Sequence, residues 1–398
     1  MPRAESPSPD ARSEVLRRTR NLKMAASAHA YVRGSTTRFY RWLEEGAQRL
    51  PDGPAVWICG DCHLGNLGPL ADAEGRVAIQ IRDLDQTVIG NPAHDLVRLG
   101  LSLASAARGS DLPGVTTARM MEAMVAGYEQ ALAGEFGEDA PRVQRPRSIR
   151  GLIKRAVRRR WRHLAQERLQ AVEPAIPLGK RFWSLTDEER QGLSSLFDGE
   201  AVHEMVTRLK QRDAAASVEL VDAAYWMKGC SSLGRLRYAA LLRVDRTEIC
   251  LVDVKEATAA AAPRAPGAAM PRDNARRVVA GAQALSPNLG ERMTAARLLD
   301  KAVVLRELMP QDLKFEIDQL SPDEATAVAG YLASVVGRAH GRQMDAATRA
   351  SWLAELTRNR TASLDAPSWL WSSVVELIAV HEAAYLDHCR LYALDQAA

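Results

Sequence analysis

The chain has 398 residues, enough for two lobes that each bury a core, and its 46% hydrophobic and 26% charged residues are typical of a globular protein. A net charge of only +4 gives no global field that would require nucleic acid as a partner. The sequence contains no run of about 18 apolar residues, so no membrane span is predicted. It has five cysteines and no pattern of a signal peptide, which favours reduced thiols and a cytoplasmic location.

The chain begins with a short tail and a helical segment. Residues 1–10 are rich in Pro and Ser and are predicted to be disordered. Residues 11–50 are predicted to be helical, with Phe39 and Trp42 on an apolar face. The sequence Pro51-Asp-Gly-Pro54 ends this segment.

Polar side chains follow the next two predicted strands, which cover residues 55–58 and 76–81. Asp61 and Asn66 lie on the loop after the first strand, which Gly60 breaks. Asp83 and Asp85 come directly after the second strand. Carboxylate and amide oxygens suit Mg²⁺, which leaves its other positions to water and phosphate. The sequence therefore predicts an oxygen-rich metal site on these two loops.

Helical patterns fill the segment that follows. Asn91 is suited to cap a helix that has Pro92 at its first position, and Thr186 with Glu189 forms a capping-box pattern. The predicted helices cover residues 91–109, 116–132, 142–170, 186–197 and 200–211.

Residues 142–170 form an amphipathic pattern with an arginine-rich face. This face suits nucleic acid or an anionic substrate, or it is simply solvated and paired with nearby acids. The near-neutral total charge and the lack of interleaved aromatic residues beyond Trp161 favour the solvated face. Nucleic acid is therefore not expected as a partner.

A β-rich pattern begins after residue 212. Residues 217–242 predict two strands around the turn Lys228-Gly-Cys-Ser-Ser-Leu-Gly234, and residues 249–255 predict a third strand that ends at Lys255. Residues 257–271 are predicted to form a flexible loop. The remainder is predicted as helices over residues 272–285, 291–300, 321–341, 347–358 and 367–396, with one strand over residues 302–305.

The loop around Asp61 resembles the catalytic loops of phosphotransferases. Asp61-x-x-x-x-Asn66 has the spacing of the kinase catalytic loop, and Gly60-Asp61-x-His63-x-Gly65-Asn66 is similar to the loop of aminoglycoside and choline phosphotransferases. Their next motif resembles Ile81-Arg-Asp83 and Gly90-Asn-Pro-Ala-His-Asp95-Leu96. Two residues depart from it: Arg82 stands where an apolar residue is usual, and Asn91 replaces an aspartate.

A second resemblance extends over nearly the whole chain, and six segments carry it: Lys23-Met-Ala-Ala-Ser27, Arg33-Gly34, Gly60 to Gly68, Asp83-Leu-Asp85, Val254-Lys-Glu-Ala257 and Leu305-Arg-Glu-Leu308. In these segments the chain resembles a bacterial domain-of-unknown-function family, number 2252.

The kinase resemblance implies an α+β, two-lobed, protein-kinase-like fold that is circularly permuted. Gly229-x4-Gly234 and Val252-Asp-Val-Lys255 resemble the glycine loop and the lysine strand of kinases, but here they follow the catalytic loop. A permutation is physically tolerable, because domain termini usually lie at the surface and often near one another. The expected parts are a disordered tail (1–10), a helical large lobe with the catalytic and metal loops (11–212), a small β-rich nucleotide-binding lobe (213–310) and a helical segment returning to the large lobe (311–398).

The same resemblance implies roles in moving the γ-phosphoryl group of ATP to a hydroxyl. Asp61 is expected to accept the hydroxyl proton, and His63 either takes part in catalysis or orders the loop. Asp95 is expected to support the catalytic-loop backbone. The expected metal ligands are Asn66, Asp83 and Asp85. The expected nucleotide-binding residues are Lys228, Gly229, Ser231, Ser232, Gly234, Lys255, Glu307 and Met309.

The implied cofactors are ATP, or another nucleoside triphosphate, and Mg²⁺, and the implied partner is a small molecule or a protein that offers a hydroxyl. Two alternatives keep the fold: a nucleotidyl transferase, and an inert nucleotide-binding scaffold. The main evidence for the scaffold alternative is that no acidic partner of Lys255 is evident, although Asp273 and Glu291 are candidates. A nucleic-acid-binding helical protein is a further alternative.

Cys59-Gly-Asp-Cys62-His63 matches the c-type haem attachment pattern and the spacing of a redox dithiol. Haem attachment needs export, and the chain shows no signal peptide. A redox Cys-x-x-Cys normally begins a helix, whereas residues 65–68 are predicted to continue as a loop. Neither role is therefore expected.

Overall fold

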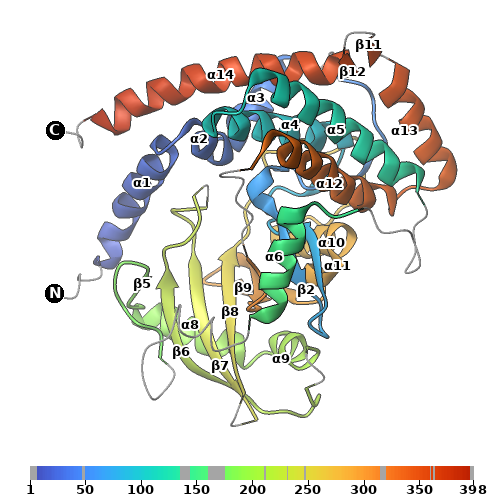
Figure 1. Ribbon diagram of the computed structural model, residues 1–398. Coiled ribbons are helices and arrows are strands. Elements are labelled where there is room, and N and C mark those ends of the chain that lie inside the picture. Colours follow the sequence, from blue (N-terminus) through green and yellow to red (C-terminus); the bar gives the residue numbers. More distant parts are fainter. Residues whose placement is uncertain are drawn as a thin grey trace.

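The computed structural model describes residues 7–394, except 47–49, 135–143, 160–174, 210–211, 231, 246–247, 314–319, 359 and 362–363. The structure is mixed α+β, with a six-stranded sheet on one side and a layer of helices on the other (Figure 1). The predicted tail up to residue 6, Ser231 and the second half of the arginine-rich helix lie outside the described residues. Pro9 already belongs to a helix, so the predicted tail is shorter than expected.

The sheet is antiparallel and pairs its strands in the order β5-β6-β7-β8-β10-β9. The predicted strands over residues 217–255 and 302–305 are confirmed. The strands are β5 (Phe182–Trp183), β6 (Val218–Trp226), β7 (Arg237–Val244), β8 (Glu248–Glu256), β9 (Met293–Leu298) and β10 (Lys301–Glu307).

The helix predicted over residues 291–300 is wrong. The short helix α11 (Pro287–Gly290) ends before that segment, and Met293–Leu298 pairs as a strand with β10 instead. Leu299 and Asp300 have φ values of 49° and 58°, so they form a two-residue turn of the kind that joins twisted antiparallel strands. Pairing with a distant part of the chain thus overrides the helix propensity of the alanine residues in this segment.

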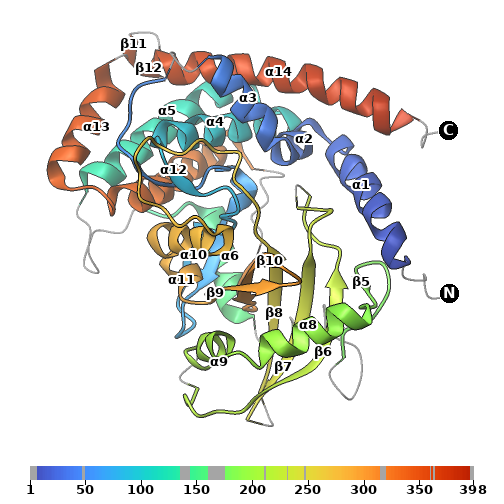
Figure 2. The same cartoon turned by 180° about the vertical axis from the view of Figure 1, so that it is seen from behind.

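Two helices, α8 (Asp187–Phe197) and α9 (Glu200–Thr207), lie across one face of the sheet (Figure 2). Thr186 and Glu189 form the reciprocal capping box that the sequence predicts at the start of α8. Phe197 of α8 and Met205 of α9 pack with Tyr238 and Val252 of the sheet in one apolar cluster. These helices therefore pack with the sheet, although they precede residue 212, after which the sequence predicts the β-rich part.

The helical layer has its largest contact between α5 (Gly114–Ala133) and α12 (Pro322–Gly341). A Cβ atom at Gly127 would lie 2.1 Å from the carbonyl oxygen of Gly330, so only glycine permits this approach of the two helices. The other helices of the layer are α3 (Thr36–Glu45), α4 (Pro92–Gly109), α6 (Arg147–Arg158), α13 (Ala346–Arg358) and α14 (Ser368–Tyr392).

The helices predicted over residues 91–109, 116–132, 321–341, 347–358 and 367–396 are confirmed, with small differences at their ends. Of the helix predicted over residues 142–170, the described part is α6, which ends at Arg158. The predicted helical segment over residues 11–50 divides into α1 (Pro9–Ala25), α2 (Ala28–Gly34) and α3. Helix α14 packs on α4, and α1 packs on α2 and α14 beside the sheet (Figure 1). A further small ribbon pairs β11 (Arg360–Thr361) with β12 (Leu364–Pro367). In the described part of the chain, no helix has the length and apolar character needed to cross a bilayer.

Two short ribbons and α10 (Asn274–Leu285) connect the sheet with the helical layer. Helix α10 contacts β9 and β10 on one side and α12 on the other. The ribbons pair β1 (Val56–Ile58) with β4 (Val88–Gly90) and β2 (Leu67–Ala71) with β3 (Val77–Ile81). The strands β1 and β3 are as predicted. The sequence does not predict β2, because Gly68 and Pro69 weaken its strand pattern, nor does it predict β4.

Candidate functional site

The loop that carries Asp61 is held by the carboxylate of Asp95 at the start of α4. The two Asp95 oxygens accept hydrogen bonds from the backbone N–H groups of Cys59 (2.7 Å) and Gly60 (2.9 Å). The Nε2 atom of His340 in α12 lies 3.1 Å from the same carboxylate. Gly60 has φ +73°, and a Cβ atom there would lie 2.1 Å from the carbonyl oxygen of Gln86. A buried charge and a glycine therefore fix the turn in which Asp61 lies.

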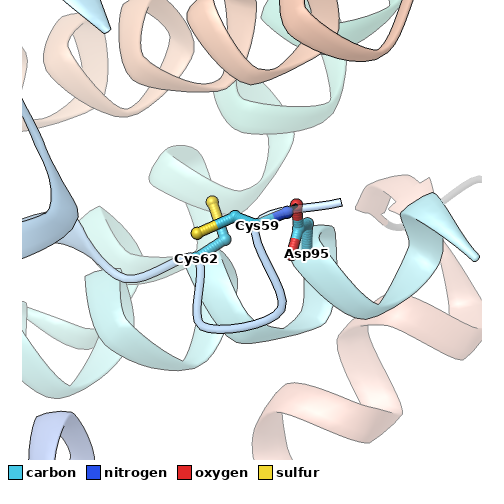
Figure 3. A group of neighbouring side chains, drawn as sticks. All are labelled: Cys59, Cys62 and Asp95. Carbon is cyan, nitrogen blue, oxygen red and sulfur yellow. Dashed lines mark hydrogen bonds between the residues drawn. The ribbon is translucent and has the colours of Figure 1, made fainter. Parts of the chain in front are cut away.

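Cys59 and Cys62 lie beside Asp95, and their potential ligand atoms are all within 4.8 Å of one another (Figure 3). The contact with Cys62 and burial raise the pKa of Cys59 well above its ordinary value. The contact with Cys59 acts to lower the pKa of Cys62, but burial together with the charges of Asp95 and Asp61 outweighs it, so this pKa is also raised. A metal requires thiolates and a carboxylate with a free oxygen, whereas these thiols stay protonated and Asp95 is already occupied. Cys59 and Cys62 are therefore best described as buried thiols of the core, and not as metal ligands.

Asp61 pairs with a buried arginine that the sequence analysis did not single out. The Nε atom of Arg98 in α4 donates to Asp61 Oδ1 at 2.8 Å, and its Nη2 donates to the carbonyl of Val32 at 2.6 Å. Arg98 is fully buried. Burial raises the pKa of the Asp61 carboxyl, and the charge of Arg98 only partly offsets this. An arginine inside an otherwise apolar helical run was the signal available in the sequence.

His63 lies next to Asp61 and stays neutral at ordinary pH. Burial lowers its pKa well below the ordinary value, and the charges of Arg33 and Arg98 add to this effect. Its Nε2 atom is 3.8 Å from Asp61 Oδ2, which is too long for a hydrogen bond. His63 therefore lies beside the carboxylate of Asp61 but is not bonded to it.

The three predicted metal ligands lie together. The amide nitrogen of Asn66 donates to the backbone carbonyl of Asp61 at 2.9 Å, which orients the Asn66 side chain. Burial acts to raise the pKa of Asp83, but the charges of Lys255 and Arg237 outweigh it and hold this pKa below its ordinary value. Burial and the neighbouring Asp83 charge raise the pKa of Asp85. The two carboxylates thus share Lys255 as a cationic neighbour, and their pKa values are shifted in opposite directions.

Lys255 of β8 reaches these carboxylates across the molecule. Its Nζ atom lies 2.5 Å from Asp85 Oδ2 and 3.2 Å from Asp83 Oδ1, although Asp83 is 172 residues earlier in the chain. In the described residues, its ion pairs are with these two carboxylates. Asp273 instead caps α10 by accepting the N–H of Arg276, and Glu291 is not among the described ion-pair partners of Lys255.

Helix α10, which follows the lysine strand, carries no acidic residue between Asn274 and Leu285. Its buried Arg277 donates to the backbone carbonyls of Asp85 (3.0 Å) and Thr258 (2.9 Å) and also contacts the carbonyl of Thr87. The helix therefore holds the Asp85 loop through an arginine, and the carboxylates that face Lys255 come from that loop itself.

The glycine-containing turn between β6 and β7 lies beside Lys255. Gly229 and Gly234 have φ values of +95° and +100°, and a Cβ atom at Gly229 would lie 2.4 Å from Ser232 Oγ. The backbone of this turn thus requires glycine. Lys228 Nζ lies 3.6 Å from Asp253 Oδ2 and 3.9 Å from the centre of the Trp226 ring.

Two neighbouring cavities meet at the carboxylate loop. The inner cavity, of about 200 Å³, is lined by Asp83, Asp85, Lys255 and the turn residues Lys228, Gly229 and Ser232. The outer cavity, of about 570 Å³, is lined by Asp61 and by residues of α1, α3 and α14. Asn66, Asp83 and Asp85 line both cavities.

Glu307 and Met309 do not line the inner cavity among the described residues. The side chain of Glu307 is buried, and its Oε2 atom lies 2.7 Å from Arg212 Nη1. Met309 is buried as well. Four of the predicted nucleotide-binding residues therefore line the inner cavity: Lys228, Gly229, Ser232 and Lys255. Glu307, Met309 and Gly234 do not line it.

The sequence pattern of one protein family matches residues 12–391, and the description of that family is "Uncharacterized protein conserved in bacteria (DUF2252)". The chain belongs to this family. Comparison with curated proteins gives no match, and comparison with solved structures gives none either. The match to the DUF2252 family thus covers almost the whole chain.

Proposed function

We propose that this DUF2252 protein is a Mg²⁺-dependent phosphotransferase that moves the γ-phosphoryl group of ATP, or of another nucleoside triphosphate, to a hydroxyl group. The observation that carries the proposal is the approach of Lys255 to Asp83 and Asp85 at the wall between two cavities. A strand lysine opposite metal-binding carboxylates is the arrangement that holds nucleotide phosphates in kinases.

The order of parts in the sheet supports a circularly permuted, kinase-like fold. A glycine turn joins β6 to β7, the lysine follows on β8, and α10 comes next. Protein kinases carry their glycine loop, their lysine strand and their next helix in this order. In this chain the loops of Asp61 and Asp83 precede the sheet instead of following it.

The residues of the inner cavity fit a nucleotide with its metal. The Nε atoms of Arg33 and Arg82 and the Nδ1 atom of His63 are buried there without a hydrogen-bond partner among the described residues. Such orphaned donors favour an anionic ligand. Asn66, Asp83 and Asp85 would hold Mg²⁺, which neutralises charge on the phosphate oxygens during transfer.

In the proposed reaction, the hydroxyl oxygen of the acceptor attacks the γ-phosphorus and forms a new P–O bond. The bond between that phosphorus and the β–γ bridging oxygen breaks, and ADP leaves with its electron pair. Asp61 accepts the hydroxyl proton. Lys255 and the backbone N–H groups of the glycine turn bind the phosphate oxygens, while Arg98 and Asn66 hold Asp61 and its loop in place.

A nucleotide-binding scaffold without catalysis is the second candidate, because α10 carries no acidic residue that could pair with Lys255 in the manner of kinases. Thermal-shift titration of ATP and Mg²⁺ on wild type and Asp83→Ala separates the two. Loss of metal-dependent stabilisation in Asp83→Ala supports the phosphotransferase, whereas binding that survives favours the scaffold. Asp187→Ala removes an exposed carboxylate of α8 and is the matched control.

Mass spectrometry of the reaction products after incubation with ATP then identifies the group transferred. A phosphoryl adduct on the acceptor, with ADP released, supports the proposal. A nucleotidyl adduct, with pyrophosphate released, would replace it by nucleotidyl transfer on the same fold.

A further inference from the structure

We propose that the outer cavity is an acceptor site for small molecules that carry a carboxylate or phosphate group besides the hydroxyl to be phosphorylated. The inference rests on the proposed function for the hydroxyl transfer, but the anion site stands on its own observations. Asp61, the expected proton acceptor, lines this cavity, so a molecule bound here has its hydroxyl within reach of the transfer site.

Four arginines from three separate parts of the chain line the outer cavity. Arg20 comes from α1, Arg38 and Arg41 come from α3, and Arg235 comes from the end of the glycine turn. Figure 1 shows how α1, α3 and the turn between β6 and β7 border the same side of the molecule. The cavity thus exists only because these segments fold together.

The side chains of these arginines form no hydrogen bond or ion pair with any other described residue. This differs from the arginines elsewhere in the fold, such as Arg12, Arg212 and Arg292, which all pair with carboxylates. Arg38 and Arg41 are three residues apart on α3, and like charges at this spacing repel each other. An anion between them would remove this repulsion, and guanidinium groups suit carboxylate and phosphate because they bind both in a bidentate manner.

The acidic residues of the outer cavity do not cancel these charges. Among the described residues they are Asp61, the expected proton acceptor, and Asp83 and Asp85, which also line the inner cavity. Asp61 is already paired with Arg98, and Asp83 and Asp85 are paired with Lys255. The part of the cavity that is away from the transfer site is therefore cationic.

The size of the cavity favours a small molecule. Its volume of about 570 Å³ is within the range of roughly 300–1,000 Å³ that is typical of small-ligand sites. A nucleic acid would instead need a long basic surface with aromatic stacking platforms. Among the described residues that line the outer cavity, the one aromatic ring besides His388 is that of Tyr392, near the end of α14. We therefore assign the arginines to a compact anionic acceptor.

Inorganic phosphate is the probe for this site. It is titrated at constant ionic strength, by calorimetry, into the protein saturated with Mg²⁺ and a non-hydrolysable ATP analogue, so that the inner cavity is filled. Arg38→Gln/Arg41→Gln is expected to bind phosphate at least tenfold more weakly than wild type. Arg150→Gln/Arg155→Gln, which removes two exposed charges from α6, is the matched control and is expected to bind as wild type does. Citrate, titrated in the same way, tests whether carboxylate is accepted as well as phosphate.

The outcomes separate this inference from the proposed function. Equal phosphate affinity in wild type and Arg38→Gln/Arg41→Gln would overturn the anion site, even if the nucleotide analogue binds. Arginine-dependent phosphate binding without any nucleotide binding would overturn the acceptor role together with the proposed function. If the double variant does not fold, Arg235→Gln replaces it, because this substitution changes a turn instead of a helix. It is also expected to weaken phosphate binding.

Discussion

Replacing Lys255 with methionine tests the contact on which the proposed function depends. Methionine keeps a long apolar side chain but removes the ammonium group, whose Nζ lies 2.5 Å from Asp85 and 3.2 Å from Asp83. A hydrogen bond to a charged group contributes about 1.5–3 kcal/mol. If Lys255 makes one such bond to a nucleotide phosphate, the Kd of ATP is expected to rise by about 10- to 150-fold.

The same variant is expected to bind Mg²⁺ more tightly when no nucleotide is present. Without Lys255, Asp83 and Asp85 face each other without their shared cation, and a divalent ion can take its place. Both effects are measured by calorimetry, with titration of ATP in the presence of Mg²⁺ and of Mg²⁺ alone.

Lys301→Met is the matched control for this experiment. Lys301 lies on β10 of the same sheet, is half exposed, and its Nζ atom lies 3.3 Å from Glu256. It lines neither cavity. An unchanged ATP affinity in Lys255→Met, or an equal loss in Lys301→Met, would refute the assignment of Lys255 to the nucleotide phosphates.

Asp61→Asn is expected to keep the nucleotide affinity but to slow ADP release from ATP by about 100- to 10,000-fold, because an amide accepts no proton. Burial raises the pKa of Asp61, so kcat/KM is expected to fall as the pH drops through that raised pKa and to recover as the pH rises. If Asp61→Asn leaves this dependence of kcat/KM on pH unchanged, the role of Asp61 as proton acceptor is contradicted. Arg98→Met leaves Asp61 without its buried partner and is expected to reduce the free energy of unfolding by about 3–5 kcal/mol in urea titrations. Arg108 forms an exposed ion pair with Glu382, so Arg108→Met is expected to reduce the free energy of unfolding by at most about 1 kcal/mol. Equal reductions in the two arginine variants would show that burial does not decide how much an ion pair contributes to stability.

Local signals determine much of the secondary structure. Asn91 accepts the N–H of Ala93 at the start of α4 and Thr186 caps α8, both as predicted, and Ser321 caps α12 in the same manner. A cap requires only a side chain and the backbone within the next three residues, so a short window of sequence contains the whole interaction. The strand patterns around Lys255 are local for the same reason, since a short run of apolar and β-branched residues is visible without knowledge of the partner strand.

Residues 293–298 became a strand only because β10 was available to pair with them. The helices α8 and α9 cover the sheet because their apolar faces meet Tyr238 and Val252, which lie far away in sequence. No short window contains those partners.

The sequence by itself thus determined which residues could carry the chemistry, since the types and spacing of Asp61, Asn66, Asp83 and Lys255 are local properties of the chain. Only the tertiary structure decided that Lys255 faces Asp83, that Arg98 neutralises Asp61, and that Arg38 and Arg235 line one cavity. These relations depend on how β8, α3 and α4 pack, and packing is settled by long-range burial of apolar surface and not by the residues on either side of a charged group.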